Sequence, residues 1–227
     1  MEKKWKTTDK RFVAFFDIMG FKELVERNPH NVIVEKLKKL NEDIIHIESM
    51  HDSEYLKKQK ISVSESKAIT FSDSIIIFSK DSTEESLNKI IIDSVYVLWS
   101  ALQNEIPIKG AISFGEITVD FDAPLFFGRP IIDAYLLHDQ LVMYSAILDH
   151  NVEKIIKEKN LVEKLDLLIV KYNTNLKSGK INHFLIRFPK TNLDEGILLL
   201  EKHYGNVSGQ PRIYVDNTIN FFKTLKS

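Results

Sequence analysis

The feature that most constrains the fold of this chain is an uninterrupted apolar segment that ends in an acid. Residues 12–16 read Phe-Val-Ala-Phe-Phe, and Asp17 follows them directly. A short apolar run without polar alternation is typical of a strand that is buried on both faces. The sequence therefore predicts a strand over 11–17, with a carboxylate at its end.

Hydrophobic spacing predicts the elements that follow this strand. Apolar residues at helical spacing indicate a long amphipathic helix over 31–50, and the β-rich runs on either side of Ser72-Asp73-Ser74 indicate a tight hairpin. We also expect a short helix over 20–27, a charged loop over 51–66, a helix over 82–104, two strands around Gly115 within 107–119, and a helix from Gly128 to about His150. This βααββαβ order predicts an α+β fold, a ferredoxin-like antiparallel sheet with helices on one face.

The length of the chain suits one large domain, or one domain with an appendage. It has 227 residues, which is enough to bury a sizeable core. We expect a core over 11–150 and a C-terminal extension over 151–227 that packs on the same domain. Within the extension, the sequence indicates a charged helix to Glu158, strands over 167–172 and 181–188, and helices near Asp194 and Asp216.

Charge and composition exclude several classes of protein. Thirty-one lysines and arginines face 32 aspartates and glutamates, so the net charge of −1 offers no basic surplus for a nucleic-acid polymer. The chain has no cysteine, which rules out disulfides, a thiolate nucleophile and cysteine-based metal sites. The longest apolar helix candidate, 90–102, is too short to cross a bilayer, and no signal-peptide core is visible. We therefore expect a soluble cytoplasmic protein without membrane contact, whose chemistry comes from oxygen ligands, histidines or backbone.

Two acids are predicted to meet at one end of the sheet. If the first strand and the hairpin are antiparallel neighbours, Asp17 and Asp73 come together there. Taken singly, Asp17 is an ordinary strand-end residue and Asp73 an ordinary turn residue, but their joint occurrence favours a functional site. Two adjacent carboxylates suit hard divalent cations such as Mg²⁺ or Mn²⁺, and such a pair can hold two metals roughly 3.5 to 4 Å apart. The N–H groups of the turn Met19-Gly20-Phe21, at a helix start, would bind a triphosphate.

The motifs resemble, in their order and gaps, a known enzyme family. Residues 15–21 read Phe-Phe-Asp-Ile-Met-Gly-Phe, and an Asp follows in the hairpin turn. Further on come Ile-Lys-Gly-Ala-Ile-Ser-Phe-Gly at 108–115 and Phe127-Gly128 with Ala134. This arrangement is similar to the catalytic domain of class III nucleotidyl cyclases over roughly residues 11–150.

The resemblance implies a lyase reaction on a nucleoside triphosphate. The ribose 3′-hydroxyl attacks the α-phosphate and releases pyrophosphate, with two divalent metals in each site. Asp17 and Asp73 would match the two metal-binding aspartates, and the backbone carbonyl of Ile18 would ligate the second metal. Family members are head-to-tail dimers with active sites between subunits, so the resemblance also implies a homodimer.

The chain departs from the family pattern at four positions. The two positions that read a purine base are aliphatic here, Ile69 and Leu125, and the usual transition-state Asn and Arg fall at Ile132 and Leu136. The chain is therefore either an inactive cyclase or similar to the bacterial Pycsar branch, which makes cyclic pyrimidine nucleotides in antiphage defence. Because both metal aspartates are present, we favour an active uridylate cyclase that signals to a separate effector activated by cyclic UMP. A cytidylate cyclase and a non-catalytic nucleotide-sensing domain stay open, whereas a diguanylate cyclase is disfavoured because its Gly-Gly turn signature is missing.

Other side chains are candidates for contacts with the substrate. Arg129, at a helix start, could replace the missing transition-state arginine. The hydroxyls of Thr70 and Ser72, near the hairpin, could contact the base. Lys67 and Lys109 lie on strands near the expected site, and either could face away from it.

Overall fold

The computed structural model describes residues 5–49 and 61–226, which form a mixed α+β fold. Its sheet has eight strands in the order β2-β3-β1-β4-β6-β8-β7, with β5 paired to β4 outside this path. The pairs are antiparallel except for β4 with β6, which is parallel. The strands are β1 (Thr8–Ile18), β2 (Ser66–Phe71), β3 (Ser74–Ser79), β4 (Ile108–Asp120), β5 (Leu125–Gly128), β6 (Ala146–Leu148), β7 (Ile169–Leu176) and β8 (Gly179–Ile186).

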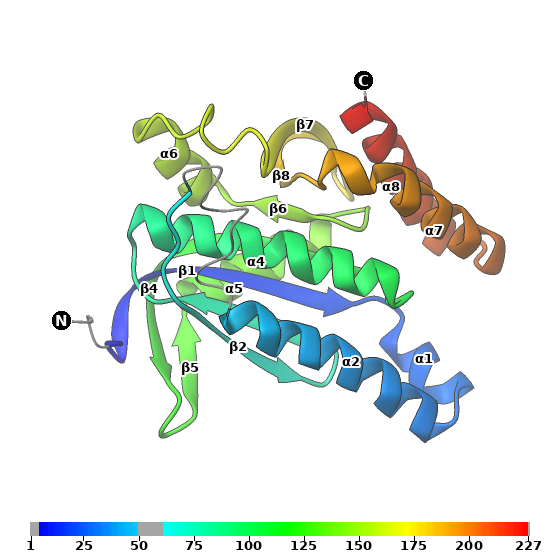
Figure 1. Ribbon diagram of the computed structural model, residues 1–227, viewed down its shortest axis with the longest axis horizontal. Coiled ribbons are helices and arrows are strands. Elements are labelled where there is room, and N and C mark those ends of the chain that lie inside the picture. Colours follow the sequence, from blue (N-terminus) through cyan, green and yellow to red (C-terminus); the bar gives the residue numbers. More distant parts are fainter. Residues whose placement is uncertain (1–4, 50–60, 227) are drawn as a thin grey trace.

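Helices cover both faces of this sheet. They are α1 (Phe21–Arg27), α2 (His30–Ser49), α4 (Glu84–Gln103), α5 (Arg129–Gln140), α6 (His150–Glu158), the 3₁₀ turn η1 (Lys190–Asn192), α7 (Leu193–Asn206) and α8 (Gln210–Lys226). In Figure 1, α1 and α2 lie on one side of the molecule and the C-terminal elements lie on the other. Among the described residues, no helix combines the length and apolarity that crossing a lipid bilayer would require.

The first strand is the interior strand that the sequence predicts. β1 pairs with β3 on one side and with β4 on the other, and residues 12–16 are all buried. The helices over 20–27, 31–50 and 82–104 and the hairpin are confirmed within one or two residues as α1, α2, α4 and β2–β3. Of the predicted loop over 51–66, residues 51–60 lie outside the described residues, as does Met50 at the predicted end of α2.

The prediction of two strands around Gly115 is wrong. β4 runs through Gly115 without a turn, and its hairpin partner is β5, which begins at Leu125. A Cβ atom at Gly115 would lie 3.0 Å from Cγ of Pro130. The missing side chain therefore allows α5 to pack closely on the strand, and the glycine does not mark a chain reversal.

The prediction of a helix that continues to His150 is also wrong. α5 ends at Gln140, and the chain turns to an extended conformation at Leu141. Residues 143–149 are all buried. An unbroken run of buried residues suits a strand between two neighbouring strands better than a helix, which buries only one face. The middle of this run forms β6, which lies between β4 and β8.

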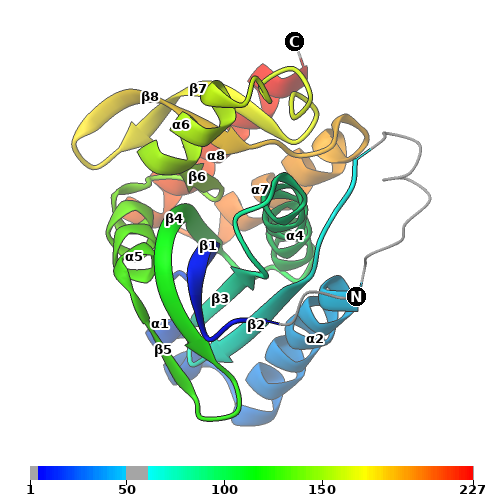
Figure 2. The same cartoon turned by 90° about the vertical axis from the view of Figure 1, so that its left-hand side faces the viewer.

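The helices lie on opposite sides of the sheet rather than on one face. The ring of Phe15 on β1 contacts Tyr135 and His138 of α5, at centroid distances of 5.6 and 4.8 Å. Figure 2 shows α5 on one side of β1 and β4 and α4 on the other side. Because neighbouring side chains on a strand alternate, the odd-numbered residues of β1 face α5.

The C-terminal third continues the same sheet. β8 pairs with β6 through Ile147 and Leu185, and β7 forms the edge beyond it. Helix α8 packs on these strands, with the ring of Phe221 4.8 Å from that of Tyr172. The predicted strands and helices of this region are present as β7, β8, α6, α7 and α8.

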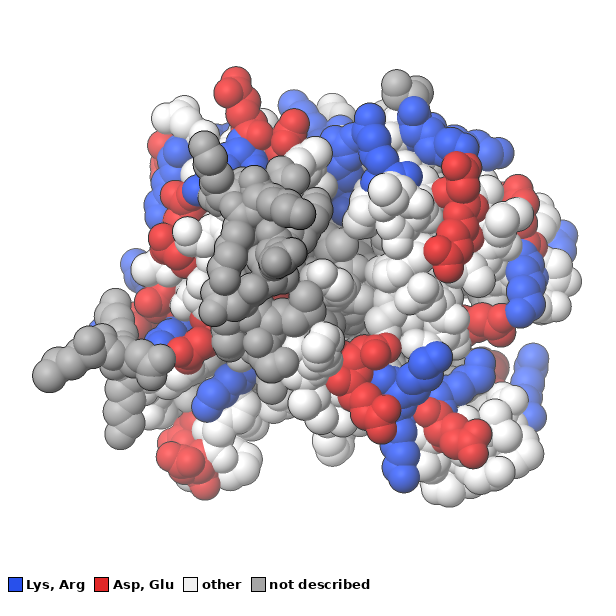
Figure 3. Space-filling model, viewed as in Figure 1, with Lys and Arg blue, Asp and Glu red and all other residues white. Residues whose placement is uncertain are grey.

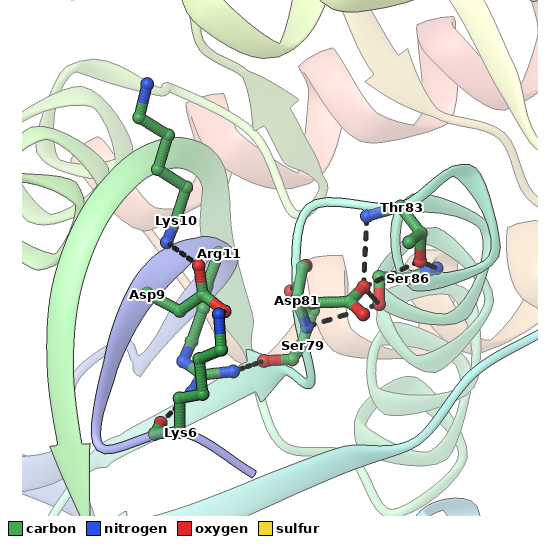
Figure 4. A network of polar contacts seen from close by, with 8 residues as sticks. All are labelled: Lys6, Asp9, Lys10, Arg11, Ser79, Asp81, Thr83 and Ser86. Atoms are coloured by element: carbon green, nitrogen blue, oxygen red, sulfur yellow. Dashed lines mark hydrogen bonds and ion pairs between the residues drawn. The ribbon is translucent and has the colours of Figure 1, made fainter. Parts of the chain in front are cut away.

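A buried polar network fixes the start of β1 to β3 and α4 (Figure 4). Arg11 is fully buried, and its guanidinium donates hydrogen bonds to the carbonyl oxygens of Ser79, at 3.1 Å, and of Lys6. Ser79 Oγ accepts a hydrogen bond from the amide of Phe12 and donates one to the carbonyl of Asp81. The Asp81 carboxylate accepts hydrogen bonds from the hydroxyls of Thr83 and Ser86 at the start of α4. Hydrogen bonds therefore hold the N-terminal end of β1 in place. Asp17 lies at the opposite end of this strand.

Candidate active site

Asp17 and Asp73 are brought together by the pairing of β1 with β3. Asp17 lies opposite Ser74, the first residue of β3, and Asp73 comes immediately before it. The backbone N–H of Ile18 donates a hydrogen bond to the carbonyl oxygen of Asp73, at 2.9 Å. Ser72, the other residue of the two-residue turn, has a left-handed φ of 56°. The hairpin turn is therefore fastened to the end of β1, as the sequence predicts.

The electrostatics of Asp17 suit a cation. Burial, and secondly the negative charge of Asp73, raise the pKa of Asp17 to about 6; Asp139 adds to this, and Lys109 opposes it. A carboxylate in this position is destabilised until a positive charge approaches. Within the described residues, no cluster of three or more His, Cys, Asp or Glu side chains could hold a metal ion. The candidate ligands for a divalent cation are therefore two carboxylates with main-chain oxygen, and the carbonyl of Ile18 is the expected third donor.

Lys109 is the cation nearest to this pair along the sheet. It lies directly opposite Asp17 in the pairing of β1 with β4, and only 5% of its surface is exposed. Its ammonium donates hydrogen bonds to the carbonyl oxygens of Asp139, at 3.1 Å, and Leu141, at 3.2 Å. Burial lowers the pKa of Lys109 to about 8. The sequence did not indicate on which face of the sheet the Lys109 side chain lies. The strand register shows that it is on the same face as Asp17.

The register also separates two neighbouring residues of β2. Phe71 pairs with Ser74, which pairs with Asp17, so Phe71 is on the face of Asp17. Its side chain is 82% exposed although it is a large apolar ring. Thr70 is on the other face, where its hydroxyl donates a hydrogen bond to Asn41 of α2 at 3.3 Å. The prediction that Thr70 contacts the base is therefore wrong, and Phe71 is a candidate that sequence reasoning missed. The hairpin register could have identified it.

The turn that follows β1 is only partly as expected. Gly20 precedes α1 with a left-handed φ of 67°, and its carbonyl accepts a hydrogen bond from the amide of Leu24. The N–H of Met19, in contrast, donates to the carbonyl of Pro107 at 2.8 Å and is not available to a ligand. The N–H groups of Gly20 and Phe21 therefore remain predicted phosphate contacts, whereas the N–H group of Met19 does not.

Arg129 is not brought to the acidic pair within one chain. It follows Gly128, which pairs with Ile117, eight residues beyond Lys109 along β4. At about 3.3 Å per residue, this places the start of α5 roughly 26 Å along β4 from the position opposite Asp17. Its guanidinium bonds Asp133 at 2.7 Å, and 80% of the side chain is exposed. Within one chain Arg129 therefore does not lie beside the acidic pair, and its contact with the substrate stays a prediction.

The end of α5 contributes further charged and aromatic groups. His138 is buried between Phe15 and Tyr135, and burial, with Lys109 nearby, lowers the pKa of His138 to about 4. A neutral histidine in such a place is structural. Asp139 forms an ion pair with Lys177 at 2.6 Å, which lowers the pKa of Asp139. Sequence reasoning missed the ion pair of Asp139 with Lys177, because Lys177 follows β7 and lies far from α5 in the sequence.

Comparison with known proteins rests on structure alone. No protein-family model matches the sequence, and no curated protein matches it. Among solved structures, the guanylate cyclase domain of RhGC from Catenaria anguillulae, in complex with GTP, superposes with a TM-score of 0.56 at 12% identity over 81% of this chain and 100% of that chain. A bacterial light-regulated adenylyl cyclase gives 0.53 at 13% identity, over 87% of this chain and 99% of the other. Adenylate cyclases from Trypanosoma brucei, in their monomeric state, give 0.52 at 12% identity, over 81% and 91%.

The chain has the fold of class III cyclase catalytic domains. Since the identities are near 12%, these similarities establish the fold alone. Within this cyclase fold, the acidic pair lies at the end of the central strand and on the turn of the neighbouring hairpin, where the resemblance of the motifs leads us to expect it.

Proposed function

We propose that this protein is a nucleotide cyclase that converts a nucleoside triphosphate into its 3′,5′-cyclic monophosphate and pyrophosphate. The observation that carries the proposal is the hydrogen bond between Ile18 and Asp73, which holds two carboxylates together at the end of the central strand of a cyclase fold. The raised pKa of Asp17 supports it, because the pair is arranged for a cation.

Each residue near this pair has a proposed role. Asp17 and Asp73, with the Ile18 carbonyl, would hold Mg²⁺ or Mn²⁺, two per site, which when bound neutralise negative charge on the phosphates. Lys109 supplies a fixed positive charge beside Asp17, and Gly20 and Phe21 supply N–H donors for the triphosphate. Ser72 stays a proposed base contact.

We propose a pyrimidine substrate, with UTP favoured over CTP, because the residues at the two purine-reading positions, Ile69 and Leu125, are aliphatic. Ile69 packs against the core cluster of Val13 and Phe78, so it offers the base no hydrogen bond. Leu125, which pairs with Asp120 far along β4 from Asp17, is exposed and equally without polar atoms, so it would face the base only in the site of a partner chain. We propose that the base stacks on the ring of Phe71, because stacking on an aromatic side chain tolerates any base and is worth about 1–3 kcal/mol.

We propose that the active unit is a homodimer with its sites at the interface. Large apolar side chains on α5 and β5 are exposed, a feature typical of interaction surfaces: Phe127, Ile132, Tyr135 and Leu136. Arg129 lies at the edge of this surface and would reach the phosphates in the site of the partner chain.

The biological role proposed here is a second messenger for antiphage defence. Cyclic UMP would act on a separate effector protein. Figure 3 shows acidic and basic side chains interspersed over the visible face, which supports a mononucleotide substrate rather than a nucleic-acid polymer.

One assay tests the activity and the base preference together. The purified protein is incubated with each of the four ribonucleoside triphosphates and Mn²⁺, and the products are separated by chromatography and identified by mass. We expect cyclic UMP with UTP, its loss in Asp73→Ala, and its retention in Asp216→Ala, which removes an exposed carboxylate on α8. If none of the four substrates gives a cyclic product, the proposal fails.

A non-catalytic nucleotide-sensing domain is the second candidate. The aliphatic residues Ile132 and Leu136 favour it, because the cyclase family carries polar groups there. In that case UTP would bind with Mn²⁺ and stabilise the fold without being converted, a result that a thermal shift beside the product assay would detect.

A further inference from the structure

A groove that is separate from the candidate active site lies along the outer side of α4. It has a volume of about 530 Å³ and runs between the middle of α4 and the segment that follows β8. This is within the range of small-molecule sites. Helix α4, which lines the groove, is on the far side of the sheet from α5 (Figure 2). Asp17 shares the face of Phe15, whose ring contacts α5, so its side chain is on the side of α5.

One face of α4 forms the floor of this groove. Ile92, Val95, Tyr96 and Trp99 are spaced three, four and seven residues apart and so form a single stripe along the helix. Helix α4 is otherwise buried nearly all round, but Tyr96 on this stripe is 38% exposed. Leu167, on the opposite wall, is 47% exposed. The sheet and its neighbours therefore leave this apolar stripe incompletely covered among the described residues.

The rim of the groove is basic. Arg187 and Lys190 line it, and no acidic residue is among its described lining residues. Arg187 donates one hydrogen bond, through Nη1, to the carbonyl oxygen of Asp166 at 2.8 Å. A guanidinium has five N–H donors, so it can bind a ligand at the same time. No ion pair between either cation and an acid is present in the described parts of the chain.

We propose that this groove binds a small amphipathic anion, with an apolar body on Trp99 and Val95 and one anionic group at Arg187 and Lys190. The apolar stripe would favour a ligand with an apolar body, because burying each methylene group stabilises the complex by about 0.8 kcal/mol. Arg187 and Lys190 would favour a negatively charged ligand, because Arg and Lys bind carboxylate, sulfonate or phosphate groups by charge-assisted hydrogen bonds. The proposal concerns binding only and does not depend on the cyclase activity.

The two tryptophans of the chain make the test direct. The Trp5→Phe variant leaves Trp99, in the groove floor, as the only tryptophan. Its emission is titrated with octanoate as the probe and, separately, with octan-1-ol and octylamine, which match the chain length but are neutral or cationic. Octylsulfonate and octyl phosphate serve as further arms that distinguish the anionic group. We expect saturable quenching or a blue shift with the anions and at least about tenfold weaker binding of the alcohol and the amine.

Variants at the rim connect the signal to the groove. Arg187→Gln and Lys190→Gln should each weaken octanoate binding by about five- to tenfold, and Lys180→Gln, an exposed lysine on β8, should leave it unchanged. Calorimetry on the natural sequence gives the same affinity without the Trp5 substitution. Equal binding of octanoate and octanol, unchanged affinity in both rim variants, or no saturable response to any anion would overturn the proposal.

Discussion

At the scale of single residues, the most informative group is the carboxylate of Asp17. Its environment raises its pKa because the site is half-buried and already holds the charge of Asp73. Such a residue lowers the stability of the free protein, which supports the proposal that Asp17 belongs to a cation site.

This raised pKa predicts a pH dependence that can be checked without substrate. The folded pKa of about 6 lies above the ordinary value of 3.8, so the stability that protonation provides is fully present below pH 3.8 and is lost as the pH rises through about 6. Asp17→Asn should remove this loss and stabilise the metal-free protein at pH 7 by about 1 kcal/mol, after allowing for solvent screening. Thermal unfolding in EDTA between pH 4.5 and 7.5 measures both effects. A natural protein that is equally stable across this range would contradict the assignment.

Metal binding should follow the same titration in the opposite sense. A divalent cation binds the deprotonated Asp17, so its affinity should fall steadily below about pH 6. Electron paramagnetic resonance of free Mn²⁺ measures the bound fraction at each pH. Asp17→Asn should bind little Mn²⁺ at any pH, whereas Asp216→Ala should behave as the natural protein does.

At the scale of elements, the contact between β1 and β4 controls the site. Gly110 lies opposite Phe16, and a Cβ atom there would be 2.4 Å from Cδ1 of Phe16 and 2.6 Å from the carbonyl oxygen of Phe15. The strands can therefore approach only because this residue has no side chain.

Gly110→Ala should consequently destabilise the protein by about 1–3 kcal/mol, since the backbone oxygen cannot move aside as a flexible side chain could. The matched control is Gly205→Ala in α7, where nothing lies within 4 Å and alanine should be neutral or stabilise by up to about 1 kcal/mol. Urea unfolding of both variants gives the comparison. Equal stability of Gly110→Ala and the natural protein would show that the strands can separate at this point.

At the scale of the whole molecule, the separation of Arg129 from Asp17 has a consequence for the proposed dimer. Within one chain they lie at opposite ends of β4. If Arg129 serves the partner, each active site combines the acidic pair of one chain with the arginine of the other.

Mixing two inactive variants tests this composite site. Asp73→Ala and Arg129→Ala should each have little activity alone, but their mixture should recover about a quarter of the natural activity per chain. Half of the randomly formed dimers would be mixed, and each would contain one intact site of two. Product formation from UTP after mixing and re-equilibration is the measurement. A mixture no more active than its components would exclude the shared site, provided that sedimentation shows mixed dimers.

The amino-acid sequence predicted the interior strand, the long helices, the hairpin and the two aspartates at the end of the sheet. These depend on local patterns: an apolar run, helical spacing, and a turn between β-rich segments. The prediction was wrong where the local pattern was ambiguous, at Gly115 and in the buried run over 143–149. At both places the residue types suit close packing against neighbouring elements, which the sequence pattern does not show.

The pairing of strands in the folded chain was needed to show which side chains share a face and which lie far apart. The strand register placed Lys109 and Phe71 beside Asp17, turned Thr70 toward α2, and set Arg129 roughly 26 Å away along β4. The groove on α4 likewise exists only because the segment after β8 folds back beside it. The physical reason is that a residue type and its spacing fix local conformation, whereas the neighbours of a side chain depend on pairings between segments distant in the sequence.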